Sequence, residues 1–460
     1  MQISQIINKS EMRKLVALAL PVLVVNLCMV GMGCVDSIVA GKAGVKDMAA
    51  VALGSSVYLP VLLFACGVLM ILGPVIANLN GKQSMSRVGF MANQALWVAI
   101  ILSIIVMPII YFLRNVFGFL SDDVTMCHIA SEYMFYVMWG IPANLGFVAL
   151  KGLNEGSNMT RPAMYVGIVG LLLNIPLNFL FVFGYCGLPA MGGAGCGAAT
   201  AVILCIEFSF MLWLVYSNPK HKPYRKHILA WRKPTSSVIS QLIRLGIPLG
   251  VSQFCEVLLF CCATLILAPL GDVPVASHQI AGNVGGLLFM FPLSMSLAAS
   301  IRVAYYHGNK DLSGLRIAIR SSYTLAMMIC MCSIISILVF RDDIVCLYND
   351  SPVIVSAASV LLIYAAVYQV SDCIQVMSAG VLRGFRETSS ISLHTFISYW
   401  IVGFPICYIC ARLDWFVPPM GAEGIWIGFI IGLTVAAVLL TRTVIRIYRR
   451  ETVALISINE

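Results

Sequence analysis

Long runs of apolar residues, separated by short polar segments, dominate this chain. Most runs reach the ~20 residues with which an α-helix crosses about 30 Å of hydrocarbon. The pattern predicts twelve membrane-spanning helices, at residues 15–39, 52–78, 88–112, 128–150, 162–184, 195–217, 242–267, 279–301, 318–340, 354–382, 392–411 and 424–446. The predicted fold class is therefore an all-α polytopic membrane protein.

Composition supports this reading and excludes a soluble domain. The 460 residues are 60% hydrophobic and 11% charged, whereas soluble proteins carry roughly a quarter charged residues. The first apolar run follows Lys9, Arg13 and Lys14 but is too long for a signal peptide and lacks a clear cleavage site. We expect it to remain as a membrane helix.

The basic residues predict the orientation of the chain. If the N-terminus is cytoplasmic, only five of the 29 Lys and Arg residues fall on the outer side. They are Lys42, Lys46, Arg114, Arg341 and Arg412. This asymmetry follows the positive-inside rule and places both termini in the cytoplasm. The net charge of +9 is then explained by topology, not by nucleic-acid binding.

The second half of the sequence repeats the first. At an offset of 227 residues, "LALPV" from Leu18 matches "LGIPL" from Leu245, and about sixty residues align without a gap. Further on, "LKGLNE" from Leu150 matches "LRGFRE" from Leu382. The halves are therefore two copies of one unit of six helices.

An even number of helices makes both copies enter the membrane from the same side, which predicts a parallel repeat. The predicted domains are an N-lobe at 1–217, a basic cytoplasmic linker at 218–239 and a C-lobe at 240–460. Such two-lobe proteins move substrates by alternating access around a site between repeats. A duplication kept only for packing is the alternative.

Three acids interrupt the apolar runs, namely Asp36, Glu256 and Asp372. A carboxylate at the bilayer centre costs roughly 2.5–3.5 kcal/mol, so it usually faces a bundle interior or a water-filled cavity. No Lys or Arg lies in the central third of any predicted helix. The acids are therefore protonated, hydrated or paired with an incoming cation such as Na⁺, H⁺ or an organic cation.

The repeat makes these acids specific to one lobe each. Ala263 matches Asp36, and Met29 matches Glu256. Positions 29 and 36 are about two turns apart, so we expect this common face to point into the lobe interior.

Polar residues at helical spacing accompany the acids. Tyr368 lies one turn before Asp372, and Ser252 lies one turn before Glu256. Oxygen ligands of this kind suit Na⁺, which makes Glu256, Asp372 and Tyr368 a candidate cation site.

Two further features of the apolar runs leave their roles open. Asn174 and Asn178 have the same one-turn spacing. They are candidates either for the N-lobe site of Asp36 or for hydrogen bonds that join helices. Glu207 is a fourth acid in an apolar run and belongs to no polar cluster, so its role stays open.

The sequence contains no sign of catalysis or of a cofactor. "NGKQS" at 80–84 lacks the upstream glycine loop of a nucleotide site, and no Ser or Cys pairs with His in a catalytic pattern. Most of the 16 cysteines lie in apolar runs, where they fill space. We expect no enzyme activity and no cofactor, and any energy for transport must come from an ion gradient.

Several segments together resemble the multidrug and toxic compound extrusion (MATE) family, and its bacterial NorM-type branch in particular. They are "GMGCVDSIVAG", "GLLLNIPLN", "APLG", "FMFPLSMSLAASIRV", "YQVSDCIQV", "LRGF" and "GFIIGL". The resemblance implies a cation-coupled antiporter for hydrophobic, often cationic drugs. It also implies an N-lobe site with Asp36, Asn174 and Asn178, and a C-lobe cation site with Glu256, Tyr368 and Asp372.

The leading hypothesis is therefore Na⁺- or H⁺-driven multidrug efflux by a monomer in the bacterial inner membrane. The alternative is a flippase for lipid-linked saccharides, which shares the two-lobe plan. Its anionic pyrophosphate substrates favour basic residues within the membrane, and these are nearly absent here. A membrane enzyme or scaffold is the third class, disfavoured by the missing catalytic cluster and the three buried acids.

Overall fold

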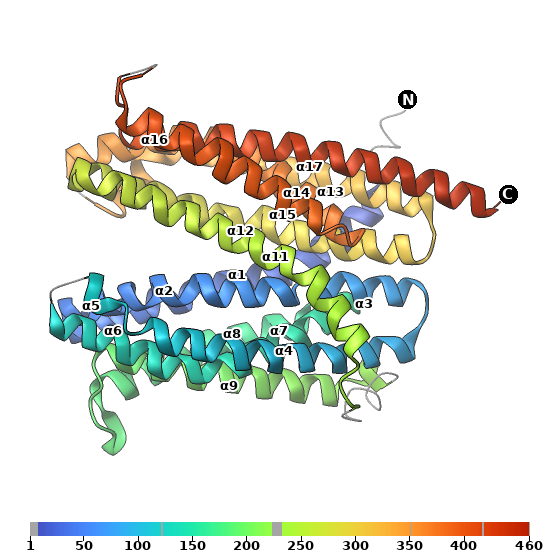
Figure 1. Ribbon diagram of the computed structural model, residues 1–460, viewed down its shortest axis with the longest axis horizontal. Helices are drawn as coiled ribbons and strands as arrows, with labels where there is room; N and C mark the ends of the chain where they lie inside the picture. Colours follow the sequence, from blue (N-terminus) through green and yellow to red (C-terminus); the bar gives the residue numbers. More distant parts are fainter. Residues whose placement is uncertain (1–7, 121–122, 223–231, 350, 416–417, 460) are drawn as a thin grey trace. The chain divides into compact units, whose positions relative to one another are not determined.

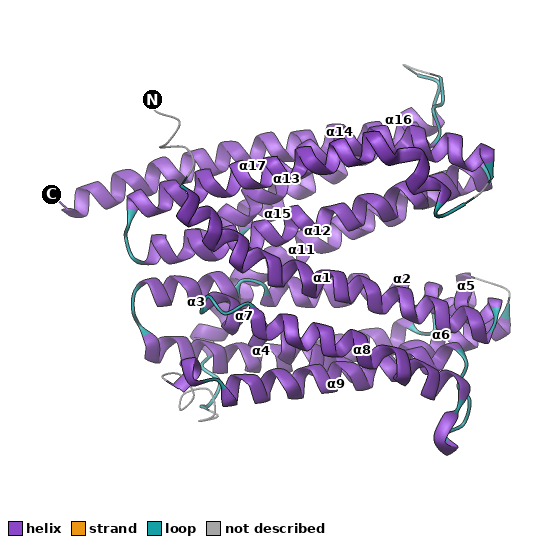
Figure 2. Cartoon of the chain, turned by 180° about the vertical axis from the view of Figure 1, so that it is seen from behind, coloured by secondary structure: helices purple, strands orange, loops and turns teal. Residues whose placement is uncertain are grey.

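The computed structural model describes residues 8–120, 123–222, 232–349, 351–415 and 418–459. Within these ranges the chain is helical, and twelve helical spans are long and apolar enough to cross a membrane. Figure 2 shows only helices and loops in the described part of the chain. The predicted fold class is confirmed.

The first half contains most of the elements that surround Asp36. They are α1 (Lys9–Ala43), α2 (Val45–Leu69), α3 (Leu72–Gly81), α4 (Met85–Leu113), α5 (Phe117–Leu120), α6 (Val124–Val137), η2 (Met138–Gly140), α7 (Ile141–Gly156), α8 (Arg161–Phe183), η3 (Tyr185–Gly187), α9 (Gly193–Ser217) and η4 (Pro219–His221). The helices form because long apolar segments must satisfy their own backbone hydrogen bonds in lipid.

The second half repeats this series. Its elements are α11 (Ser236–Leu267), η5 (Ala268–Leu270), α12 (Asp272–Gly308), α13 (Leu312–Cys346), α14 (Pro352–Gly384), α15 (Ser389–Phe396), η6 (Ile397–Gly403), α16 (Phe404–Arg412) and α17 (Ala422–Asn459). In Figure 1, α12, α14 and α17 run along one another, and α14 packs extensively against both of the other two helices.

The chain forms two compact units that differ in their bounds from the predicted lobes. One unit is Leu20–Gly250, and the other combines Met1–Ala19 with Val251–Glu460. Helices α1 and α11 therefore contribute residues to both units.

Contacts at the two shared helices explain these bounds. Arg302 of α12 binds Glu11 near the start of α1, with 2.6 Å between Nε and Oε1. Gly250 of α11 lies against Gly67 of α2, where a Cβ at position 67 would stand only 2.8 Å from the Gly250 Cα. Sequence comparison detects the duplication but not these contacts.

Three of the membrane spans are interrupted helices. A break at Met70 and Ile71 separates α2 from α3, the 3₁₀ turn η2 separates α6 from α7, and the π-helix η6 precedes α16. Pro405, just after η6, has no N–H, and its ring conflicts with the carbonyl four residues earlier in an α-helix. A wider π turn relieves that conflict, and such turns often occur at functional sites.

Outside the membrane spans, aspartates cap two helices. Asp123 accepts hydrogen bonds from the backbone of Thr125 and Met126 at the start of α6, and Asp311 accepts one from Gly314 at the start of α13. The Lys46 ammonium, 2.7 Å from Asp123, and the two backbone donors lower the pKa of Asp123. Backbone Gly314 and the Ser313 hydroxyl lower the pKa of Asp311.

Candidate functional site

Asp36 lies at the centre of a hydrogen-bonded cluster in the Leu20–Gly250 unit. Its side chain is 9% exposed. Its Oδ1 accepts hydrogen bonds from Asn174 Nδ2 at 3.0 Å and from Asn178 Nδ2 at 2.7 Å. The sequence did not decide whether the two asparagines belong to a polar site or only form hydrogen bonds that join helices. In the structure, both donate to the Asp36 carboxylate.

Helix α9 completes this cluster with residues that the sequence analysis missed. The Thr200 hydroxyl donates to Asp36 Oδ2 at 3.4 Å, and the Cys196 thiol donates to the Asp36 backbone carbonyl at 3.6 Å. Both residues lie one turn apart in an apolar segment. A search for polar side chains in that segment would have found Thr200, but its contact with Asp36 depends on the packing of α9 beside α1.

The asparagines leave acceptors free beside the carboxylate. Asn178 Nδ2 also donates to the Asn174 backbone carbonyl at 2.9 Å. The side-chain Oδ1 atoms of both asparagines are buried and accept no hydrogen bond from the described residues. Two amide oxygens and a carboxylate are oxygen ligands of the kind that bind hard cations.

The predicted residues of the second site lie together in the other compact unit. Asp372 and Tyr368 are on α14, and Glu256 on α11 is close enough to interact electrostatically with both. Tyr399 of η6 joins this group, in electrostatic range of all three. The sequence missed Tyr399, because a π-helix cannot be recognised from apolar periodicity alone.

Asp372 is fully buried, and neither of its carboxylate oxygens accepts a hydrogen bond from the described residues. Arg383 lies on the same helix, α14, about three turns after Asp372. It is in electrostatic range of Glu256, and its Nη2 donates to Ser296 Oγ at 2.7 Å. Within the described residues, Asp372 therefore has no neutralising partner within hydrogen-bond reach.

Ser252 was expected beside Glu256, but its hydroxyl donates to Thr395 at 3.1 Å.

A cavity of about 180 Å³ opens beside Glu256. Its lining combines one carboxylate with aromatic rings and glycines: Glu256, Phe260, Gly282, Gly285, Gly286, Phe289, Tyr368 and Trp426. A Cβ at Gly282 or Gly286 would meet no atom within 4 Å, so these glycines keep the space open. Carboxylates and aromatic faces both attract organic cations.

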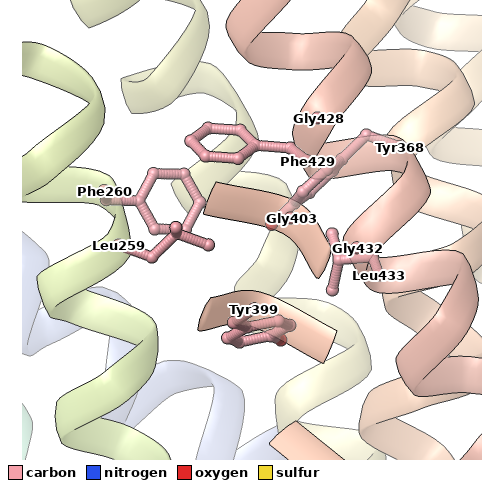
Figure 3. Close-up of a pocket in the computed structure, with 9 residues that line it drawn as sticks. All are labelled: Leu259, Phe260, Tyr368, Tyr399, Gly403, Gly428, Phe429, Gly432 and Leu433. Carbon is pink, nitrogen blue, oxygen red and sulfur yellow. The ribbon is translucent and has the colours of Figure 1, made fainter. Parts of the chain in front are cut away.

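A second, narrower cavity shares Phe260 and Tyr368 as walls and is shown in Figure 3. Its other walls come from α11, η6 and α17, among them Tyr399 and Phe429. The ring centroids of Phe260 and Phe429 are 4.8 Å apart. Aromatic rings therefore line both cavities next to Tyr368.

One expectation about the repeat is wrong. Met29, the counterpart of Glu256, is 52% exposed, although Asp36 two turns later is 9% exposed. Side chains of α8 and α9 contact Asp36, whereas half of the Met29 side chain is left exposed.

Comparison with known proteins agrees with the repeat and the fold. The MatE family model matches residues 21–180 and again residues 248–409. The two matches begin 227 residues apart, as in the internal repeat.

Two bacterial proteins are similar over nearly the whole chain. Multidrug resistance protein NorM of Aliivibrio fischeri is 39% identical over 444 residues, which cover 96% of each chain. Multidrug resistance protein MdtK of Yersinia pseudotuberculosis is 40% identical over 431 residues, or 94% of each chain.

A solved structure, that of the eukaryotic MATE transporter AtDTX14, has the same fold. The TM-score is 0.86 at 17% identity, with coverage of 97% of this chain and 99% of that chain. Because one family model matches both halves and the bacterial relatives are about 40% identical over almost all of the sequence, this chain belongs to the MatE family.

Proposed function

We propose that this protein is a secondary active multidrug efflux transporter that exchanges Na⁺ or H⁺ for hydrophobic cations. The observation that carries the proposal is the cavity that joins the Glu256 carboxylate to Phe260, Tyr368 and Trp426. Its mixture of one negative charge and several aromatic faces suits a lipophilic cation better than an anion. The names of the NorM and MdtK relatives support the same activity.

The two polar clusters supply places for the coupling cation. Asp372 has no hydrogen-bond donor within the described residues, so a proton or Na⁺ would neutralise it. Asp36, with the free amide oxygens of Asn174 and Asn178, offers a second oxygen site. Cation binding and drug binding then compete, either because both neutralise the same carboxylates or because they favour different conformations.

The proposal also covers the location and orientation of the protein. The twelve spans and the bacterial relatives support a multi-pass protein of the inner membrane, and the distribution of basic residues favours cytoplasmic termini. We also propose that the protein acts as a monomer and needs no cofactor besides the coupling cation.

Drug uptake into inverted vesicles, which corresponds to efflux from the cell, tests the proposal under an imposed Na⁺ or pH gradient. We expect Glu256→Gln and Asp372→Asn to slow gradient-driven efflux of a lipophilic cation by roughly tenfold or more. Asp342→Asn is the matched control, because the Asp342 side chain is 67% exposed. Wild-type efflux by both neutralised variants would refute the role of the second site.

Binding measurements on the purified protein test the flippase alternative. We expect a lipophilic cation to bind and a lipid pyrophosphate not to compete with it. Gly282→Leu should weaken cation binding, because the added side chain enters open space in the cavity. Competition by the lipid pyrophosphate would favour the flippase instead.

A further inference from the structure

Glu207 is a buried carboxylate that neither polar cluster uses. It lies on α9, it is 6% exposed, and it has no hydrogen bond or ion pair with any described residue. An unpaired carboxylate within a membrane helix costs roughly 2.5–3.5 kcal/mol. A residue that serves packing alone would not need this charge.

The fold makes room for this carboxylate at one glycine. A methyl group at Gly170 of α8 would collide with Glu207 Oε1 and stand 3.0 Å from its Cδ. Any residue other than glycine would therefore push the carboxylate away. The Glu207 side chain is held against the α8 backbone, inside the Leu20–Gly250 unit.

Glu207 lies on the same helix faces as the Asp36 cluster. Gly170, Asn174 and Asn178 follow one another at one-turn spacing on α8. Glu207 is two turns after Thr200 on α9, a distance of about 10 Å along the helix. The helices α8 and α9 thus carry both the donors of the Asp36 cluster and the Gly170–Glu207 contact.

Two titratable groups of neighbouring helices face Glu207. Cys28 of α1 and Lys151 of α7 both lie in electrostatic range of its carboxylate. Lys151 in turn is 3.8 Å from Glu155, near the end of α7. Glu207 therefore lies between the Asp36 cluster and a charged pair close to a helix terminus.

We propose that Glu207 is a second cation-accepting carboxylate, which takes up the coupling cation between the Asp36 cluster and the Lys151–Glu155 pair. The inference rests on the proposed function. A carboxylate oxygen can hold either a proton or Na⁺, and the step forms no covalent bond apart from that to the proton. Lys151 would keep the site from holding the cation permanently, because its positive charge opposes a second cation nearby.

Transport by the purified, reconstituted chain tests this role with Glu207→Gln. Efflux of a lipophilic cation is driven by a Na⁺ gradient at equal pH, or by a pH gradient without Na⁺. A third assay measures drug–drug exchange without any gradient. We expect Glu207→Gln to slow at least one gradient-driven rate by roughly tenfold and to leave exchange within about twofold of wild type. If only the Na⁺-driven rate falls, Glu207 takes up Na⁺, and if only the pH-driven rate falls, it takes up a proton.

Glu132→Gln is the matched control, because the Glu132 side chain is 47% exposed and belongs to the same unit. We expect wild-type rates from it in all three assays. Wild-type gradient-driven rates from Glu207→Gln would overturn the proposal. An equal loss of exchange and of gradient-driven transport would also overturn it, because a structural role predicts that result.

Gly170→Ala provides an independent test from the other helix. We expect it to reproduce the Glu207→Gln phenotype, and to add no further loss in a Glu207→Ala background, because Gly170→Ala displaces the same carboxylate that Glu207→Ala removes. Additive losses would contradict the proposal.

If the wild-type chain shows no gradient-driven transport, the proposed function fails and binding decides the role of Glu207. Isotopic Na⁺ binding and proton uptake by the purified chain are then compared. Identical binding by wild type and Glu207→Gln would overturn the proposal.

Discussion

Asp36 and Asp372 are both buried aspartates, yet they differ in the hydrogen bonds that their carboxylates accept. Three side-chain donors reach the Asp36 carboxylate, whereas none of the described residues donates to Asp372. Hydrogen-bond donors stabilise an ionised carboxylate, and an isolated one must gain a proton or a cation. The two acids therefore differ in how far they depend on an external ion.

At this residue scale, we predict that Asn178→Ala lowers the free energy of unfolding by about 1.5–3 kcal/mol, because a buried charged acceptor loses a donor. In an Asp36→Ala background the same change should cost much less, since no charge remains to be satisfied. Chemical unfolding in detergent measures both values. Ser209→Ala is the control, because its exposed hydroxyl donates only to Cys205 in the same helix. Equal costs in both backgrounds would contradict the assigned contact.

At the scale of elements, interrupted helices bring the polar residues into place. The π-helix η6 positions Tyr399 near Glu256, Tyr368 and Asp372. Pro405, two residues after η6, has no N–H to donate to a carbonyl within this π-helix. An undisturbed α-helix would present residue 399 in a different direction.

Helix caps give a prediction that concerns pH. Asp311 has a lowered pKa in the folded state because the Gly314 N–H and the Ser313 hydroxyl stabilise its charged form. Its contribution is thus complete above the ordinary Asp pKa of 3.8 and is lost as the pH falls through the lower folded value. We expect Asp311→Ala to cost about 1 kcal/mol at neutral pH and nearly nothing below the folded pKa.

Thermal unfolding in detergent across this acidic range measures the difference between Asp311→Ala and wild type. Asp342→Asn, at the other end of α13, should show no such pH dependence because Asp342 caps no helix and is largely exposed. A cost of Asp311→Ala that stays constant with pH would refute the charged cap.

At the scale of the whole molecule, a buried ion pair fixes the start of α1 within the unit that contains α12. Arg302 binds Glu11 through Nε and Nη2, at 2.6 and 2.9 Å, and the Tyr306 hydroxyl donates to Glu11 at 2.9 Å. Glu11 is 3% and Arg302 is 7% exposed. This cluster explains why residues 8–19 group with Val251–Glu460.

We predict that Arg302→Met destabilises the protein by about 3–5 kcal/mol, because it leaves Glu11 buried without a countercharge. Adding Glu11→Gln should recover much of the loss, since the unpaired charge is then removed. Unfolding in detergent measures both variants. Lys14→Met should have little effect, because Lys14 is 55% exposed and 3.8 Å from Glu11. No recovery in the double variant would contradict the ion-pair account.

The sequence by itself determined the twelve spans, the duplication and the presence of costly acids, because apolar run length and insertion energy depend on residues close together in the chain. Only the tertiary structure decided which polar residues meet. Thr200 reaches Asp36 from 164 positions away, Tyr399 joins Glu256 through a π turn, and Glu207 fits against Gly170. Such contacts depend on how helices rotate and pack against one another, and apolar periodicity does not fix that geometry in a membrane, where most faces are hydrophobic.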